Sequence, residues 1–282
     1  MKSTFLFGPF IGSLSWEFYR FSPYAIFMKK LYPRIQLAVL TRPERFDLYG
    51  QYADFLVPLK IENDLIKNQV CFKLNNFNTT DYDKLVNQFQ LMYKKRSPIE
   101  DHFYPDIIDY RYKVHWQFPR FKMNYDFRPR TKNIEVIKNN LPKKSFILIT
   151  PPYNTNLMKK LFSCISRNRL HRKYLFLTCG YCGERFENID NIPISNETTK
   201  IGYLIEIMKR SKLVIGPKSD LIHLSLLLKC PVISWGKSTN LNLMNPFGTR
   251  ITMFNDVPYE SIEKQLIQEL GRKKNGTDYN CF

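Results

Sequence analysis

The chain has 282 residues, of which 44% are hydrophobic and 15% are aromatic, so it can bury a core and is not a wholly disordered polycation. Its 43 basic and 25 acidic side chains give a formal charge of +18. This excess predicts an anionic partner: nucleic acid, an acidic membrane surface or a phosphorylated ligand. The length fits one large domain or two small ones.

Six cysteines are spread thinly through the chain, which argues against a disulfide scaffold and predicts a reduced, cytoplasmic compartment. The opening MKSTFLFGPFIGSLSWEF contains a short apolar run that predicts a buried strand rather than a signal peptide. No window approaches the roughly 18 uncharged apolar residues of a membrane span, so none is expected.

The first part of the chain, up to about Leu59, alternates between strand and helix patterns. The predicted strands are Thr4–Phe7, Ile35–Leu40 and Phe55–Leu59, and the predicted helices are Trp16–Leu31, kinked at Pro23, and Arg45–Tyr52. Strands and helices that alternate through short links are typical of a parallel sheet covered by helices.

The middle of the chain, from about Lys60 to Lys132, has a less regular pattern. A helix is predicted at Asp81–Lys95, and in residues 103–130 aromatic side chains and Arg or Lys alternate with prolines. One interpretation is an irregular connection between domains, starting near residue 96, whose aromatic side chains pack on both. The other is an exposed basic-aromatic surface on which bases or sugars stack.

Strand and helix patterns return from Asn133 onward. The predicted helices are Asn133–Asn140, Asn156–Arg167, Ile201–Arg210, Asp220–Leu228 and Tyr259–Leu270, and the predicted strands are Phe146–Thr150, Tyr174–Thr178, Asn191–Ile194, Leu213–Ile215 and Val232–Trp235. We therefore expect an α/β protein with two Rossmann-like lobes, residues 1–132 and 133–282, with a cleft between them and a mobile tail from about residue 271.

The most informative stretch runs from Lys212 to Gly236, where an apolar strand ends at Gly216 and a helix begins near Ser219. Free backbone N–H groups and the positive end of the helix dipole favour a phosphate at such a turn. Ser219 can cap the helix and offer a hydroxyl, Lys218 adds charge, and His223 can reach a phosphate or a ribose. The alternative is a plain strand–helix unit in which Ser219 is only a cap.

This stretch resembles the C-terminal, donor-binding lobe of GT-B glycosyltransferases of the heptosyltransferase type. The matching residues are Gly216, Ser219, His223, Pro231 and Gly236, whereas Lys218 and Asp220 depart from the usual G-N-D-S-G-x-x-H. The N-terminal part is similar to the opening of glycosyltransferase-like proteins, with matches at Gly12, Trp16, Glu17, Arg42, Pro43, Tyr49, Ala53 and Asp54.

The resemblance implies that a sugar nucleotide, with UDP as the expected nucleotide, binds the C-terminal lobe, and that neither a metal nor a separate cofactor is required. The residues expected around the donor are Thr150, Tyr153, Asn154, Gly216, Lys218, Ser219, Asp220 and His223. On the acceptor side, Glu17 is the candidate base, and Arg20 and Arg42 can hold phosphate or orient it. The alternatives are a helix-start carboxylate, structural ion pairs and loop packing.

Other motifs argue against other chemistries. Cys179 and Cys182 form a single C-x-x-C, whereas a zinc site needs a second pair and a thioredoxin-like site needs a different context. Asp81-Tyr82-Asp83 has the letters of a D-x-D metal motif, but it begins a polar helix instead of ending a strand. There is no G-x-x-x-x-G-K-[ST], G-x-G-x-x-G, H-E-x-x-H or G-x-S-x-G.

The predicted function is therefore transfer of a sugar from a nucleotide-sugar donor to an anionic acceptor. Residues 1–132 hold 21 basic and 13 acidic side chains and residues 133–282 hold 22 and 12, so both lobes share the excess charge. On charge alone, a hydroxymethylated base in DNA is the favoured acceptor, bound through the cleft and residues 103–130, in a bacterium or a virus-infected cell. The alternatives are an envelope lipid or polysaccharide acceptor, and a non-catalytic nucleic-acid-binding protein.

Overall fold

The computed structural model describes residues 2–11, 14, 17–59, 79–104, 124–129, 145–150, 155–179, 190–192, 201–236, 245, 247–254 and 259–271. The chain divides into two compact units, Met1–Asn139 with Thr199–Leu204, and Asn140–Thr198 with Ile205–Phe282. The predicted boundary near residue 132, the predicted helix Asn133–Asn140 and the predicted tail beyond Gly271 lie outside the described residues.

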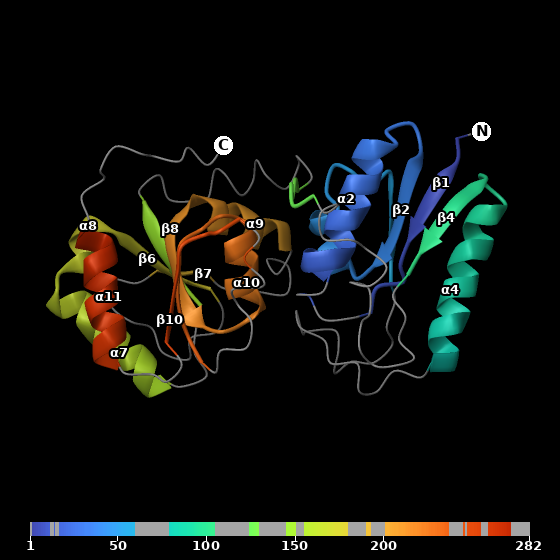
Figure 1. Ribbon diagram of the computed structural model, residues 1–282. Coiled ribbons are helices and arrows are strands. Elements are labelled where there is room, and N and C mark those ends of the chain that lie inside the picture. Colours follow the sequence, from blue (N-terminus) through green and yellow to red (C-terminus); the bar gives the residue numbers. More distant parts are fainter. Residues whose placement is uncertain are drawn as a thin grey trace. The chain divides into compact units, whose positions relative to one another are not determined.

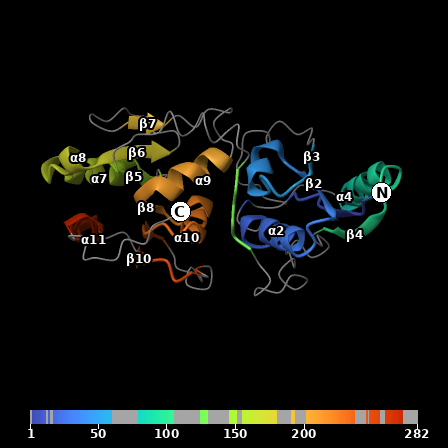
Figure 2. The ribbon, with the colours of Figure 1, turned by 90° about the horizontal axis from the view of Figure 1, so that it is seen from above.

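Unit 1 is built on a parallel sheet with the strand order β3-β2-β1-β4 (Figures 1 and 2). Its strands are β1 (Thr4–Phe7), β2 (Gln36–Thr41), β3 (Phe55–Pro58) and β4 (Ile99–Phe103). The first three match the predicted strands, whereas β4 was not predicted, because its sequence IEDHF carries three polar or charged residues. Aromatic rings of different elements meet in the core, where Phe7 lies 4.6 Å from Phe103 and 5.5 Å from Phe21 between ring centroids.

The helical segments of unit 1 differ from the prediction in two respects. A single helix with a kink at Pro23 is expected, but the structure has a π-helical turn η1 (Glu17–Phe21), after which α2 (Ser22–Leu31) begins. Pro23 lies in the first turn of α2, where its missing N–H has no helical partner to lose. A 3-10 helix η2 (Pro43–Leu48) replaces the predicted helix Arg45–Tyr52, and α4 (Thr79–Lys94) matches its prediction closely.

Unit 2 is built on a second parallel sheet, with the order β10-β9-β8-β5-β6-β7. Its strands are β5 (Phe146–Ile149), β6 (Leu175–Cys179), β7 (Asp190–Ile192), β8 (Ser211–Pro217), β9 (Val232–Trp235) and β10 (Ile251–Phe254). The edge strand β10 was not predicted.

Helices cover both faces of this second sheet (Figures 1 and 2). They are α7 (Thr155–Arg167), α8 (Leu170–Lys173), α9 (Ile201–Arg210), α10 (Asp220–Leu227) and α11 (Tyr259–Gly271). Ile147 and Ile149 belong to a core with side chains of α7 and α11, whereas Leu148, buried on the other face, has the opposite direction in the strand. Strands buried on both faces need continuous apolar runs, such as FILI in β5.

The strand orders define one switch point in each sheet. In unit 2 the chain runs outward from β5 through β6 to β7, and then returns to the other side of β5 with β8. In unit 1 it runs from β1 to β3 and returns with β4. Ligands of open parallel sheets bind beyond the carboxyl ends of the strands at such points.

The predicted α/β class is confirmed by the two parallel sheets and their helices. In the described part of the chain, no helix is long and apolar enough to cross a bilayer.

Candidate functional site

The turn between β8 and α10 lies at the switch point of unit 2. Ser219 is extended, with φ −156° and ψ 170°, and its Oγ accepts a hydrogen bond from the Ile222 N–H at 3.5 Å. Ser219 is therefore the N-cap of α10, as the sequence predicts. Before it, the Lys218 N–H donates to the Trp235 carbonyl at 2.9 Å, which ties the turn to the end of β9.

Gly216 and Thr150 meet at the carboxyl ends of the two neighbouring strands. The Thr150 N–H donates to the Ile215 carbonyl at 2.8 Å, and Thr150 is 2% exposed. A Cβ added to Gly216 would lie 1.6 Å from Thr150 Oγ1 and 2.8 Å from its carbonyl oxygen, so only glycine fits. The fold thus brings together Thr150 and Gly216, which are 66 positions apart in the sequence. The predicted site residues Tyr153 and Asn154 lie outside the described residues.

His223 lies one turn into α10 and is 8% exposed. Its pKa is lowered to about 4, mainly by burial, while Asp220 opposes the shift and Lys218 contributes to it. The imidazole is therefore neutral at neutral pH and can act as either a hydrogen-bond donor or an acceptor. Asp220, in the first turn, is half-buried.

These features together form a site suited to an anion. The first turn of α10 has backbone N–H groups beyond those that its cap satisfies, and its positive dipole end lies at the carboxyl edge of the sheet. Lys218 adds a positive charge next to that turn, and the glycine at 216 lets Thr150 lie directly against the end of β8. We refer to Thr150, Gly216, Lys218, Ser219 and His223 as the switch-point site.

Glu17, the predicted catalytic base, lies in an enclosed hydrogen-bond network. Its side chain is fully buried, and its carboxylate accepts hydrogen bonds from Thr41 Oγ1 at 2.6 Å, Tyr49 OH at 2.7 Å and Arg45 Nη1 at 2.8 Å. Because the carboxylate is enclosed by three donors and no contact beyond them tests its role, the role of Glu17 as a base stays a prediction. The alternative interpretation, a structural carboxylate, fits the structure, and burial together with the charge of Glu17 raises the pKa of Tyr49.

Arg20 and Arg42 are also buried, with exposures of 9% and 4%. Arg42 follows β2, and its Nε lies 3.6 Å from the Glu44 carboxylate. Arg45, which the sequence analysis does not single out, is the cation that pairs with Glu17. The donors to the Glu17 carboxylate are Thr41, Arg45 and Tyr49, and neither Arg20 nor Arg42 is among them. The predicted role of these two arginines in orienting Glu17 therefore stays a prediction.

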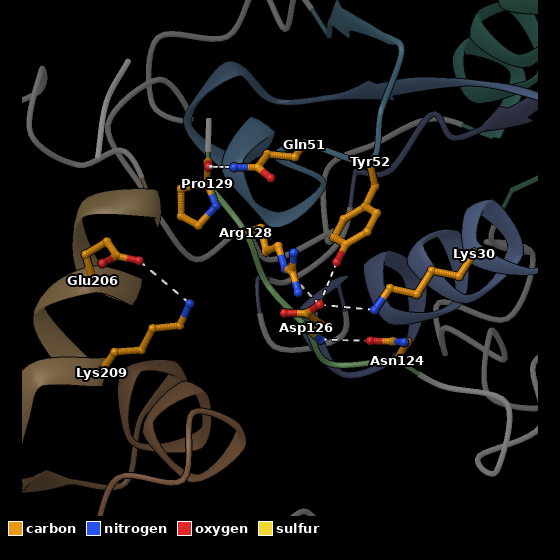
Figure 3. Close-up of polar contacts among 9 residues, drawn as sticks. All are labelled: Lys30, Gln51, Tyr52, Asn124, Asp126, Arg128, Pro129, Glu206 and Lys209. Carbon is orange, nitrogen blue, oxygen red and sulfur yellow. Dashed lines mark hydrogen bonds and ion pairs between the residues drawn. The ribbon is translucent and has the colours of Figure 1, made fainter. Parts of the chain in front are cut away.

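The described part of the basic-aromatic segment, residues 124–129, packs against unit 1 (Figure 3). The Asp126 carboxylate accepts hydrogen bonds from Tyr52 OH at 2.6 Å and Lys30 Nζ at 3.0 Å, and lies 2.9 Å from Arg128 Nε. Phe127 is 1% exposed. In this stretch the packed connection fits the structure better than a stacking surface. Residues 105–123 lie outside the described part.

His102, which lies at the switch point of unit 1, is not among the site residues predicted from the sequence. Its Nε2 is 2.7 Å from the Gly8 carbonyl at the end of β1, and burial lowers its pKa. Its position at the end of a strand could have indicated it, but the polar sequence IEDHF does not predict that strand. Among the described residues no cluster of three or more His, Cys, Asp or Glu could hold a metal, and Cys164 and Cys230 are buried free thiols.

The sequence matches no protein-family model and no curated protein. Solved structures share its fold. The ADP-heptose lps heptosyltransferase II of E. coli aligns with a TM-score of 0.58 and 11% identity over 96% of this chain and 98% of that one. A family 9 glycosyl transferase of Veillonella parvula aligns with a TM-score of 0.54 and 11% identity over 99% and 91%. The UDP-GlcNAc 2-epimerase of Methanocaldococcus jannaschii has a TM-score of 0.53 at 11% identity over 98% and 94%.

The chain therefore has the fold of heptosyltransferases and other GT-B-like proteins. This confirms the fold-level resemblance that the sequence around Gly216, Ser219 and His223 indicates. At 11% identity the likeness concerns the fold, and its chemistry has to be argued from the site.

Proposed function

We propose that this protein is a glycosyltransferase that uses a nucleotide-sugar donor, whose diphosphate binds at the switch-point site. The observation that carries the proposal is the close approach of Gly216 to Thr150 directly before the Ser219-capped start of α10. It lies at the β5–β8 switch point, where open parallel sheets bind nucleotides. The shared fold of nucleotide-sugar enzymes supports the proposal.

The switch-point site would act mainly on the leaving group. Transfer of the sugar leaves a nucleoside diphosphate, whose negative charge grows as the glycosidic bond breaks. The N–H groups of the first turn of α10 and the Lys218 ammonium stabilise that charge without a change of position. His223, neutral at neutral pH, can hydrogen-bond a ribose hydroxyl or a phosphate oxygen.

The nucleotide is proposed to be uridine or adenosine diphosphate. UDP is the expectation from the sequence resemblance, whereas the E. coli enzyme in the comparison is named for ADP-heptose and the epimerase for UDP-GlcNAc. Because the site described above contacts phosphate and ribose, both nucleotides fit it, and a binding measurement decides between them.

The acceptor is proposed to be anionic, because a diphosphate donor does not account for a charge of +18 shared by both halves. A phosphorylated envelope glycan or lipid has the support of the lps named for the E. coli enzyme. A hydroxymethylated base in DNA is the second candidate, and the charge alone favours it. The packing of residues 124–129 leaves that stretch unsuited to base stacking.

A thermal-shift titration with UDP, ADP, GDP and CMP and their sugars tests the donor site. A bound nucleotide stabilises by RT ln(1 + [L]/Kd), about 2.7 kcal/mol at a hundredfold excess over Kd. We expect a shift with UDP or ADP that is lost in Gly216→Ala and reduced in Ser219→Ala. Ser225→Ala is the matched control, because Ser225 lies in the same helix and its Oγ donates to the Leu221 carbonyl.

A turnover assay then distinguishes the chemistries. Release of nucleoside diphosphate that increases with a lipid, glycan or hydroxymethylated DNA acceptor supports transfer and identifies the acceptor. Conversion of UDP-GlcNAc to an epimer without an acceptor would assign the epimerase reaction instead. Wild-type protein that shows no shift with any of the nucleotides would overturn the proposal and leave the non-catalytic alternative.

A further inference from the structure

The amino ends of the strands of unit 2 carry a row of basic side chains, at the edge of the sheet opposite the switch-point site. Lys173 precedes β6, Arg210 and Lys212 flank the start of β8, Lys229 precedes β9, and Arg169 precedes α8. We refer to Arg169, Lys173, Arg210, Lys212 and Lys229 as the amino-edge patch. Since the strands are parallel and in register, these residues lie along one edge.

Acidic side chains at this edge neutralise other cations. Arg167 pairs with Glu263, Lys209 with Glu206 at 3.7 Å, and Arg250 with Glu269 at 2.6 Å. By contrast, the five members of the amino-edge patch form no ion pair with any carboxylate in the described part of the chain. All of them except Lys212 are exposed. The patch therefore presents charge that the protein itself does not neutralise.

Two members of the patch occupy unfavourable backbone conformations. Arg169 and Lys229 have φ of 51° and 61°, the only positive values of non-glycine residues in the described part of the chain. Each lies two residues after a helix, at the position where glycine is the usual occupant. A cation near a helix C-terminus gains from the dipole, but it does not need the left-handed position for that. At both positions the chain carries a positive charge in place of the conformationally easier residue.

The positive potential at this edge is visible at Tyr174. Lys212 Nζ lies 4.5 Å from the ring centroid and donates to the phenol oxygen at 2.8 Å, and Lys173 Nζ lies 5.4 Å from the same ring. Burial raises the pKa of this phenol, yet the two ammonium groups lower it below its ordinary value. The two ammonium groups around one ring therefore concentrate positive charge at this edge.

The form of the patch fits a surface rather than a groove. It follows strand ends with a spacing of about 4.8 Å, so it extends roughly 15 Å from β6 to β9. Beside it, Phe247 is 42% exposed, and Lys229 Nζ lies 5.0 Å from its ring. An exposed aromatic ring beside a lysine is typical of attachment to a membrane interface. Single-stranded nucleic acid needs several exposed rings, and Tyr174 is buried.

We propose that the amino-edge patch docks this protein on an anionic lipid bilayer, with Phe247 entering the head-group layer and the patch binding lipid phosphates. The strand β8 has seven residues, so the opposite edge of the sheet is about 20 Å away, and the switch-point site stays outside the bilayer contact. Docking therefore does not depend on the donor chemistry proposed above.

Sedimentation with vesicles tests this proposal on the full chain. We expect binding to phosphatidylcholine vesicles that contain about 30% phosphatidylglycerol, weak binding to pure phosphatidylcholine, and loss of binding when salt rises from about 0.1 M to about 0.5 M. Each basic residue near an anionic surface contributes about fivefold to the partition coefficient. The triple variant Lys173→Gln, Arg210→Gln, Lys229→Gln should therefore bind about a hundredfold less tightly.

Two further variants keep the test sharp. Lys94→Gln, Lys95→Gln, Arg96→Gln removes the same charge from the end of α4 in unit 1, so it should retain most of the binding. Lys229→Gly should lower the partition coefficient about fivefold without lowering the Tm, because glycine is the easier residue at that φ. A loss in Lys229→Gly that comes with a lower Tm would point to folding instead.

Several outcomes would overturn the proposal. They are equal binding to both kinds of vesicle, an equal loss in the α4 variant, and tighter, patch-dependent binding to duplex DNA than to the anionic vesicles. The nucleotide thermal shift serves as the separating readout. Patch variants that lose vesicle binding but keep the nucleotide shift would establish docking as independent, whereas a protein without any nucleotide shift can still dock.

Discussion

A carboxylate such as that of Glu17 can act as a catalytic base or as a structural ion-pair partner, and its surroundings in the fold distinguish the two roles. Its three donors come from the end of β2, from η2 and from the turn after η2, at Thr41, Arg45 and Tyr49. An ion pair at this depth has been removed from water at both ends, so the free energy of each partner depends on the other. The ion pair therefore holds the π-helical turn against η2, and the Thr41 hydrogen bond holds it against the end of β2.

Replacing Glu17 by Gln should lower the free energy of unfolding by about 3–5 kcal/mol, because Arg45 would be left as a buried, uncompensated charge. Urea unfolding followed by circular dichroism measures this. The matched control is Glu44→Gln, since Glu44 is 35% exposed and lies 3.6 Å from Arg42. That change should cost about 1 kcal/mol or less. Equal, small losses in both variants would contradict a structural role for Glu17.

His223 should make the stability of the protein depend on pH. Its folded pKa of about 4 lies below the ordinary 6.5, so the unfolded chain binds more protons between these values. The free energy of unfolding is therefore highest above pH 6.5 and falls by about 3 kcal/mol as the pH falls to about 4.

The comparison of wild type with His223→Gln isolates this effect. The difference between their unfolding free energies should shrink, or favour the variant, as the pH falls from about 6.5 to about 4. His171→Gln is the control, because His171 lies on α8 at the other edge of the sheet. A difference between wild type and His223→Gln that stays constant with pH would show that His223 does not titrate in this range.

Among the elements, the segment 124–129 behaves as a strap on unit 1. Besides the Asp126 contacts, the Gln51 N–H donates to the Arg128 carbonyl at 3.0 Å, and Gly50, with φ 41°, leaves no room for a Cβ beside that carbonyl. Burial opposes ionisation of Asp126, but the hydrogen bonds from Tyr52, Arg128 and Lys30 lower its pKa to about 2. The carboxylate is therefore charged, and fastens the strap, at all ordinary pH values.

Asp126→Asn should loosen the strap. We expect faster hydrogen exchange at the Gln51 amide and at Phe127, with the amides of β1 and β2 unchanged, because opening would be local. Asp83→Asn on the exposed face of α4 is the matched control and should leave these rates unchanged. Acid should have the same effect as the variant, since the contribution of Asp126 is lost as the pH falls from about 4 toward 2.

Helices and strands were predicted correctly where the apolar pattern of the segment itself defines them. They were missed where pairing with another strand determines the structure. Val232–Trp235 and Ile201–Arg210 are observed as predicted, because apolar periodicity marks them. The strand β4 has the sequence IEDHF and is half-exposed, so it becomes a strand by pairing with β1 rather than by its own propensity. Pro23 was expected inside a helix, and the π-helical turn before it moved the helix start to Ser22.

At the scale of the whole molecule, the charge of +18 should itself affect stability. Like charges on one compact chain repel one another, and salt screens that repulsion. The Tm should therefore rise when NaCl increases from about 0.02 M to about 0.2 M. Sucrose at matched osmolality is the control for solvent effects. A Tm that falls with salt would mean that the ion pairs outweigh the repulsion.

The amino-acid sequence by itself determined the α/β class, the alternation of strands and helices, the Ser219 cap and the shared basic charge, because each of these is written in neighbouring residues. Only the tertiary structure decided that Glu17 pairs with Arg45, that Thr150 lies against Gly216, and that the basic residues of the amino-edge patch lie along one edge of the sheet. These depend on strand order and pairing across tens of residues. Non-local pairing places side chains that no local pattern can bring together.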